Sequence, residues 1–216
     1  MLGDINFPEG ITWDIKYLNS YDMCGEGFSA TTMEYAYYRC TMTVIDVKYD
    51  TSKVTNFSNA FDNCRNLIIC PDINTTSATT MENMFYYCRS LQTIPFLNTS
   101  NVSNITSMFN SCSKLKSSPL LDCGKVSSMS YMFGWDDINS LKDLGGFKNL
   151  KISCTGNLNL LPKLTVQSLM NVINNLYDFR ANGSTTTKTL QLGTTNLNKL
   201  TDEQKAVAVN KGWSLT

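Results

Sequence analysis

The sequence predicts an α/β fold in which short parallel strands alternate with short helices along a solenoid of stacked coils. The first observation behind this prediction is that Cys40, Cys64, Cys88 and Cys112 follow one another in equal steps of 24 positions. The second is that apolar columns share this register, above all the aromatic residue three positions before each cysteine and its counterpart one unit further on: Tyr37, Phe61, Phe85, Phe109 and Phe133. Several columns in one register are typical of solenoid proteins, whose units bury a continuous core by stacking.

The third observation is that the two halves of each unit differ in periodicity. Val102, Ile105, Met108 and Cys112 follow helical spacing, so a short helix or helical turn is predicted over residues 101–112. The segment after each cysteine is short, apolar at intervals and closed by a proline (Pro71, Pro95 or Pro119), which predicts a short strand. A unit of this size cannot bury a core alone, so the strands of successive coils are expected to form a parallel sheet with a spacing of about 4.8 Å.

The repeat resembles a known family. The unit MFxxCxxLxxxPxLxTSxVxxMxx, present as MFYYCRSLQTIPFLNTSNVSNITS over residues 84–107, is similar to the repeat of BspA-like leucine-rich repeat proteins of bacterial surfaces. The resemblance covers about residues 30–135, and the chain departs from it at Thr43 and after Trp135. It implies a leucine-rich-repeat-like, right-handed solenoid with adhesive or protein-binding roles, located outside the cell or at its surface, and it implies no catalytic residues.

The two ends of the chain are interpreted as parts of the same solenoid domain. Residues 30–135 hold four to five repeats, and residues 1–29, with Trp13, Tyr17 and Phe28, are expected to form an N-terminal cap. Residues 136–216 are expected to form an irregular insert followed by degenerate capping repeats, although the length also permits a second domain.

Two helices are expected within this C-terminal part. Residues 166–177 form an amphipathic pattern after Pro162 and Thr165, and a Thr201–Gln204 capping box begins a helix that stops at Gly212. Residues 188–193 and 213–216 are strand-like. The interval from Leu190 to Trp213, and also that from Leu192 to Leu215, is nearly equal to the interval between successive cysteines of the repeat.

Composition limits the classes of function. The chain is 42% hydrophobic and has 18 basic and 18 acidic residues, so nothing in its net charge favours nucleic acid as a partner. It contains no apolar run of about 20 residues, so direct membrane insertion is not expected. The N-terminus has no signal-peptide pattern, and a removed signal would leave no trace. Histidine is absent, which argues against an enzyme and against a metal site. We expect a monomer without cofactors.

A disulfide and a metal site are two alternatives to simple packing of the cysteines. Side chains stacked in line have parallel Cβ vectors, which is poor disulfide geometry, so Cys40, Cys64, Cys88 and Cys112 are interpreted as a buried thiol ladder. No C-x-x-C pair supports a metal site. A disulfide among the cysteines outside the ladder stays open: Cys24, Cys70, Cys123 and Cys154.

An Asp and Asn column, consisting of Asp50, Asn74, Asn98 and Asp122, could indicate a calcium-binding solenoid. The glycines and paired acids of such proteins are missing. Side chains that accept hydrogen bonds from backbone amides in turns explain the column better.

Two surfaces are candidates for ligand binding. Tyr38, Tyr86, Tyr87 and Trp135 share columns with the polar residues Asp62, Asn63, Asn110 and Ser111, which predicts exposure along one rim. Tyrosine and tryptophan dominate protein interfaces, although packing between coils would also explain them. The second surface is the outward face of the predicted strands, with Ile68 and with Gln92, Thr93, Lys116 and Ser117.

The sequence therefore favours a non-enzymatic scaffold that binds or adheres to a protein or glycan at a bacterial surface. One alternative is a structural spacer or the receptor-binding tip of a larger assembly such as a phage tail fibre. An enzymatic alternative would use carboxylates in the insert, Asp136, Asp137 and Asp143, but acids in a loop are usually solvated.

Overall fold

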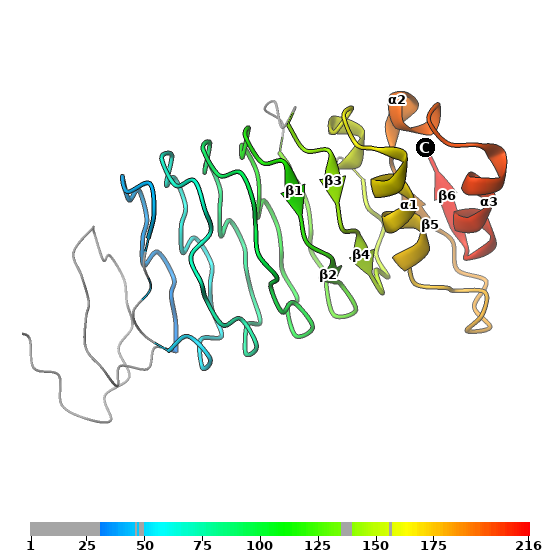
Figure 1. The fold of residues 1–216 in the computed structure, drawn as a ribbon. Helices are drawn as coiled ribbons and strands as arrows, with labels where there is room; N and C mark the ends of the chain where they lie inside the picture. The colour runs from blue at the N-terminus through cyan, green and yellow to red at the C-terminus, as the bar shows by residue number, and fades with distance from the viewer. Residues whose placement is uncertain (1–30, 46, 48–49, 135–139, 156) are drawn as a thin grey trace, which may run out of the picture.

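The computed structural model describes residues 31–45, 47, 50–134, 140–155 and 157–216. In this part of the chain, successive segments stack side by side in one row, with the helices gathered towards the C-terminus (Figure 1). The expected N-terminal cap, residues 1–29, lies outside the described residues. We call each of the stacked segments, which corresponds to one repeat of the sequence, a coil.

Parallel backbone bridges hold the coils in register. One ladder joins equivalent residues of every described repeat: Thr32, Asn56, Thr80, Asn104 and Ser128. A second ladder runs through Ile69, Thr93 and Ser117, within the segments that were expected to be strands. Most of these pairings are single bridges and not strands of two or more residues. The right-handed, leucine-rich-repeat-like class of this stack stays a prediction.

Residues 101–112, which were expected to form a short helix or helical turn, contain overlapping hydrogen-bonded turns. The N–H groups of Met108, Asn110 and Cys112 donate within the coil to residues three positions earlier. Three other N–H groups of this segment donate to the next coil: Ile105 to Ser128, Ser107 to Ser130 and Phe109 to Met132. An α-helix would direct its N–H groups along its own axis. The alternating turns instead use half of these groups to join neighbouring coils.

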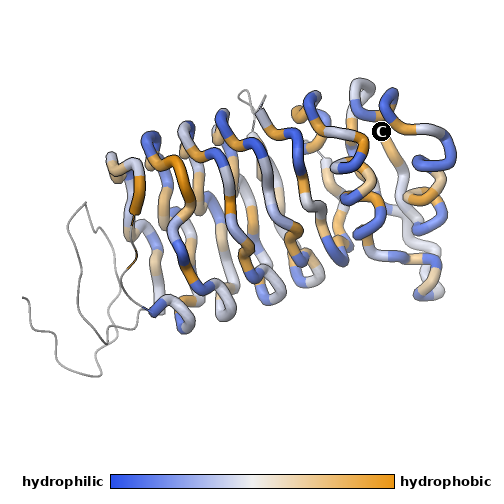
Figure 2. Tube along the Cα trace, in the orientation of Figure 1, coloured by the Kyte–Doolittle hydropathy of each residue, from blue (hydrophilic) through white to orange (hydrophobic). Residues whose placement is uncertain are grey.

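The core consists of the columns that the repeat defines. Phenylalanine rings stack along the row, with 5.4 Å between the ring centres of Phe61 and Phe85 and 6.0 Å between those of Phe85 and Phe109. Offset stacking of this kind adds to the gain from burying the rings. Figure 2 shows hydrophobic and hydrophilic stretches alternating along every coil. The hydrophobic residues of each coil form the buried core, and the hydrophilic residues between them meet solvent.

The regular elements lie in the second half of the described chain. The strands are two or three residues long and pair in parallel as β1 with β3, β2 with β4 and β5 with β6. In chain order the elements are β1 (Ser117–Ser118), β2 (Leu121–Asp122), β3 (Asp143–Leu144), β4 (Phe147–Lys148), the 3-10 helix η1 (Leu158–Leu160), α1 (Val166–Asn175), β5 (Lys188–Leu190), α2 (Gly193–Leu197), α3 (Asp202–Asn210) and β6 (Trp213–Leu215).

The helix signals at the C-terminus are confirmed. Thr165 caps α1 by accepting a hydrogen bond from Ser168 N. Thr201 and Gln204 form the expected capping box of α3, which ends before Gly212, a residue with positive φ. No helix in the part of the chain that the structure describes has the length and apolarity needed to cross a bilayer.

The strand-like segments at the C-terminus form β5 and β6, which pair in parallel. Leu190 pairs with Leu215, and Lys188 pairs with Trp213. The buried Leu190 and Leu192 alternate with Gln191 in β5 and the segment after it. Leu192 N–H donates to Thr216 O beyond β6.

Candidate binding site

The clearest concentration of aromatic and cationic side chains lies on the turns around the cysteine ladder. Arg39, Asn63 and Tyr87 occupy equivalent positions with φ of 59°, 62° and 57°. Their backbone N–H groups all donate to the next coil, to Asp62, Tyr86 and Asn110 respectively. The side chains therefore leave successive coils at the same place. We call the exposed row the Tyr–Arg rim and define it as Tyr38, Arg39, Arg65, Tyr86, Tyr87 and Arg89.

Rings and guanidinium groups contact one another along the rim. Arg39 lies 5.0 Å from the ring centre of Tyr38, while Arg89 and Arg65 lie 5.0 and 6.0 Å from that of Tyr87. Tyr86 and Tyr87 meet edge to face with 4.6 Å between ring centres. The tyrosines are half-buried and the arginines are exposed. Cation–π contacts of this kind help to hold the guanidinium groups in place.

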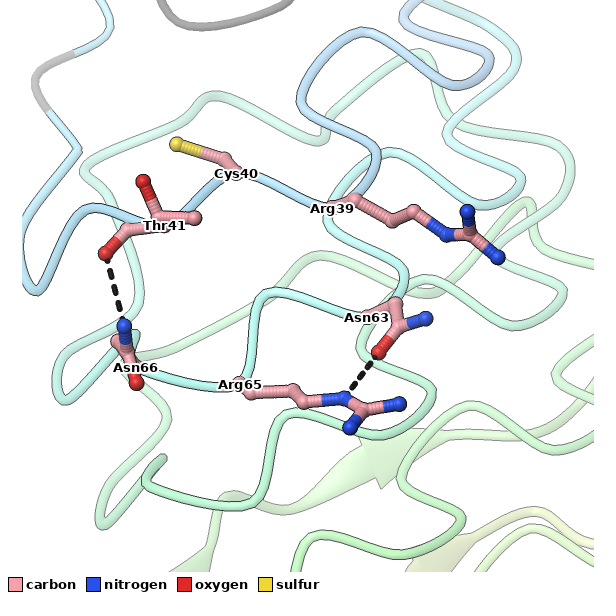
Figure 3. Close-up of a pocket in the computed structure, with 6 residues that line it drawn as sticks. All are labelled: Arg39, Cys40, Thr41, Asn63, Arg65 and Asn66. Atoms are coloured by element: carbon pink, nitrogen blue, oxygen red, sulfur yellow. Dashed lines mark hydrogen bonds between the residues drawn. The ribbon is translucent and has the colours of Figure 1, made fainter.

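A shallow hollow of about 330 Å³ opens at the end of the rim towards the first described coil, lined by Arg39, Cys40, Thr41, Asn63, Arg65 and Asn66. Figure 3 shows the Arg39 and Arg65 side chains extending in the same direction with Asn63 between them. Arg65 Nε donates to Asn63 Oδ1 over 2.6 Å. On the other side of the hollow, Asn66 Nδ2 donates to the carbonyl of Thr41 over 3.0 Å.

One carboxylate lies among the rim residues. Asp62 occupies the column between Tyr38 and Tyr86, where it is half-buried. Burial raises the pKa of Asp62 to about 6, although the positive charge of Arg39 acts in the opposite direction. Near neutral pH this carboxylate partly offsets the charge of the arginines.

The structure brings together three of the four predicted rim aromatics, and Trp135 lies outside the described residues. The expectation that the polar residues in these columns are exposed was wrong for Asn110 and Ser111, which are 9% and 3% exposed. Ser111 donates to Asn110 Oδ1 over 2.9 Å, so the two side chains satisfy one another in the interior. Gly134, the next residue in the column of Asn110, packs so closely on it that a Cβ would lie 2.0 Å from Asn110 Oδ1.

The residues predicted on the strand face lie in one row. Thr93 and Ser117 belong to the same bridge ladder, and Lys116 Nζ donates to Gln92 Oε1 over 3.0 Å. Thr93 and Lys116 are exposed, whereas Gln92, Ser117 and Ile68 are partly buried. These residues hold one cation paired with an amide and no aromatic ring, so the face offers less for recognition than the Tyr–Arg rim.

The cysteine ladder is buried, and its described thiols make hydrogen bonds between coils. Cys64, Cys88 and Cys112 donate to the carbonyl oxygens of Tyr37, Phe61 and Phe85 over 2.9, 3.1 and 3.0 Å. Burial raises the pKa of the Cys112 thiol well above its usual range. Outside the ladder, Cys70, Cys123 and Cys154 are all free thiols, and Cys24 lies outside the described residues.

The Asp and Asn column accepts hydrogen bonds within turns, as the sequence indicates. Asp50, Asn74, Asn98 and Asp122 each accept a hydrogen bond from the backbone N–H two residues later, over 2.8 to 3.1 Å. Among the residues that the structure describes, no three side chains of the His, Cys, Asp or Glu type lie close enough to hold a metal ion. Of the acids in the insert, Asp143 is exposed in β3, and Asp136 and Asp137 lie outside the described residues.

Sequence reasoning missed the three arginines of the rim. Arg65 and Arg89 share one column of the repeat in successive coils, with Thr41 and Ser113 at the neighbouring positions of that column. This periodicity could have identified them. Arg39 stands in a different column and reaches the same surface because its side chain leaves from a turn of the preceding coil.

Comparison with known proteins places the chain in a family. A family model described as "Mycoplasma protein of unknown function, DUF285" matches residues 31–143, which is more than half of the chain. No curated protein and no solved structure matches it. The chain belongs to the DUF285 family, a family associated with BspA-like repeat proteins.

Proposed function

We propose that this chain is a non-enzymatic binding module: a BspA-like solenoid whose stacked coils present the Tyr–Arg rim to another macromolecule at a bacterial surface. Complementarity along several coils provides the affinity, and no chemical step is involved. The resemblance of the repeat to those of BspA-like surface proteins supports the surface location, and the rim supports the binding role.

The observation that carries the proposal is that Tyr87 and Arg39 are large side chains at a position where the repeat adopts left-handed backbone. The φ of 57° at Tyr87 lies in the left-handed region, which costs a residue with a Cβ about 1 to 2 kcal/mol. Asn63, at the equivalent position of the preceding coil, is one of the residue types with a Cβ that tolerate this region best. Arg39 stands at the same position one coil earlier with φ of 59°. The conformation belongs to the repeat, since Ser111 in the following coil has a φ of 61°, but Arg39 and Tyr87 use this position to carry large side chains on the rim.

The left-handed conformation of Tyr87 suggests a variant whose effect on binding can be distinguished from an effect on folding. Replacing Tyr87 with Asn restores the better-suited residue, so the Tyr87→Asn variant should fold at least as stably as the wild type. In a screen of the purified chain against extracellular matrix proteins and glycans, this variant should lose most of the binding of the wild type.

The matched control is Tyr131→Asn. Tyr131 is also exposed and has a φ of 54°, but it belongs to an earlier turn of a coil two repeats away from Tyr87. Full binding by Tyr87→Asn, or the absence of any ligand in the screen, would contradict the proposal and favour the structural spacer.

A further inference from the structure

The rim carries a local positive charge on a chain that has none overall. The whole sequence has equal numbers of basic and acidic residues. On the rim, the exposed Arg39, Arg65 and Arg89 accompany a single carboxylate, Asp62. A ligand attracted to this row must therefore be recognised by the local arrangement, since the net charge of the protein does not attract it.

Within the part of the chain that the structure describes, Arg65 Nε is the donor of these three guanidinium groups that makes a hydrogen bond. The contacts with Tyr38 and Tyr87 place each guanidinium carbon 5.0 to 6.0 Å from a ring centre, and a guanidinium group carries five N–H donors in its plane. Arg65 uses Nε for its bond to Asn63 and keeps its two terminal nitrogens. Within the described ranges, no carboxylate lies within ion-pair distance of Arg39, Arg65 or Arg89. Guanidinium groups held in this way can bind carboxylate or sulfate groups with two parallel hydrogen bonds.

The backbone of the rim is not available to a peptide. The N–H groups of Arg39, Asn63 and Tyr87 are bonded to the next coil, and those of Arg65 and Arg89 are bonded within their own turns. A bound peptide strand needs such groups for main-chain pairing. The rim instead offers half-buried phenol rings between cations. The C–H face of a sugar ring can pack on such rings, because the face of an aromatic ring carries partial negative charge.

We propose that the Tyr–Arg rim binds an acidic polysaccharide, with the sugar rings against Tyr38 and Tyr86 and the carboxylate or sulfate groups on Arg39, Arg65 and Arg89. This inference rests on the proposed binding function and specifies its partner class. Arg65 and Arg89 repeat one position in consecutive coils, and Arg39 reaches the same surface from the preceding coil, so a polymer with several charges matches the rim better than a single small anion does.

The test measures binding to dextran sulfate and to polygalacturonate, with unsulfated dextran as the neutral probe, by calorimetry at two salt concentrations. The wild type should bind both acidic polymers and not the neutral one, and its affinity should fall as salt rises. The double variant Arg65→Gln/Arg89→Gln should bind at least tenfold more weakly. A double variant with the same change in net charge, Lys53→Gln/Lys163→Gln, should bind like the wild type, because both lysines are exposed away from the rim.

Two further variants separate the roles of charge and stacking. Arg89→Lys keeps the charge but loses the planar fork and should still weaken binding several-fold. Tyr86→Ala should weaken binding without changing its salt dependence, since it removes a ring and no charge. Circular dichroism and thermal unfolding of each variant establish that it is folded.

Three outcomes would overturn the inference: no binding to either acidic polymer, equal weakening by the lysine and arginine double variants, or equally tight binding of poly-glutamate, which would indicate an acidic peptide. The proposed function is judged separately by the Tyr87→Asn variant in the general screen. If Tyr87→Asn abolishes binding to a protein while the acidic polymers do not bind, the rim is a binding site and the partner class is wrong.

Discussion

The thiol of Cys88 donates a hydrogen bond to the carbonyl oxygen of Phe61 in the preceding coil, with 3.1 Å between Sγ and the oxygen. Phe61 O also accepts the N–H of Cys64, so one carbonyl joins a turn of its own coil to the side chain of the next. The cysteine ladder thus contributes a repeated hydrogen bond between coils in addition to its apolar volume.

Replacing Cys88 with Ala should therefore cost more stability than replacing Cys70 with Ala. Both residues are buried, but the Cys70 thiol reaches only the carbonyl of its neighbour Pro71, over 3.4 Å. Loss of the bond between coils should add about 0.5 to 1.5 kcal/mol to the cost of the lost packing. Urea unfolding of both variants measures the difference. Equal losses would show that the ladder acts through packing alone.

The ladder thiols should resist alkylation while the protein is folded. Burial raises the pKa values of Cys88 and Cys112, so almost no reactive thiolate forms at pH 8, and the side chains are fully covered. Iodoacetamide labelling followed by peptide mass spectrometry should show both sites modified in urea and unmodified in buffer. Rapid modification in buffer would mean that the coils open locally around the ladder.

The sequence predicts the core well because the same period recurs in several columns of apolar residues. The four cysteines of the ladder are buried, as are the phenylalanines of the aromatic column, and only Tyr37 at the start of that column is partly buried among its described members. The turns between Val102 and Cys112 could not be distinguished from a helix, since their buried residues recur at intervals of three and four in both structures. Positive φ at Ser107 and Ser111 decides between them, and serine does not indicate such a conformation in a sequence. The position of Arg39 on the rim could not be predicted for a related reason, because it depends on the direction in which a turn projects the side chain.

A buried threonine should be more important to the stack than an exposed one. Thr75, 3% exposed, donates through Oγ1 to Asn98 O in the next coil over 3.2 Å and accepts Asn98 N–H over 2.8 Å. Thr75→Val keeps the shape but leaves that N–H without its partner, which should cost about 1 to 3 kcal/mol. Thr79→Val removes an exposed hydroxyl bonded to Thr55 O and should change stability by less than about 0.5 kcal/mol. Similar costs in urea unfolding would contradict the importance of the buried pair.

The stacked rings should couple neighbouring coils strongly. Phe85 lies between Phe61 and Phe109, with interplanar angles of 7° and 12°. Phe85→Ala should cost about 3 to 5 kcal/mol, because it removes both ring contacts and leaves a cavity. Phe96→Ala, at a ring that is 77% exposed, should cost less than about 0.5 kcal/mol. Chemical denaturation measures both, and a cost below about 1 kcal/mol for Phe85→Ala would show that the coils collapse into the space.

Asp62 should make the protein less stable as the pH rises from about 4 to about 6. Burial raises the pKa of its carboxyl to about 6 in the folded chain, above the value of about 4 expected when unfolded. The folded state therefore binds more protons in this window, so the free energy of unfolding falls as the pH rises through it. Asp62→Asn removes that loss and should raise Tm at pH 7.5 but not at pH 4.

The size of this gain is limited by solvent. Part of the Asp62 side chain is exposed, and screening should reduce its effect to about 1 kcal/mol, or about 2 to 4 °C in Tm. Asp72→Asn, at an exposed carboxylate outside the rim, controls for the change in net charge and should leave Tm nearly unchanged at both pH values. A Tm gain for Asp62→Asn that is equally large at pH 4 would show that the carboxyl does not titrate differently in the folded chain. Because the Asp62 carboxylate offsets part of the charge of the arginines, Asp62→Asn should bind acidic polymers at least as tightly as the wild type.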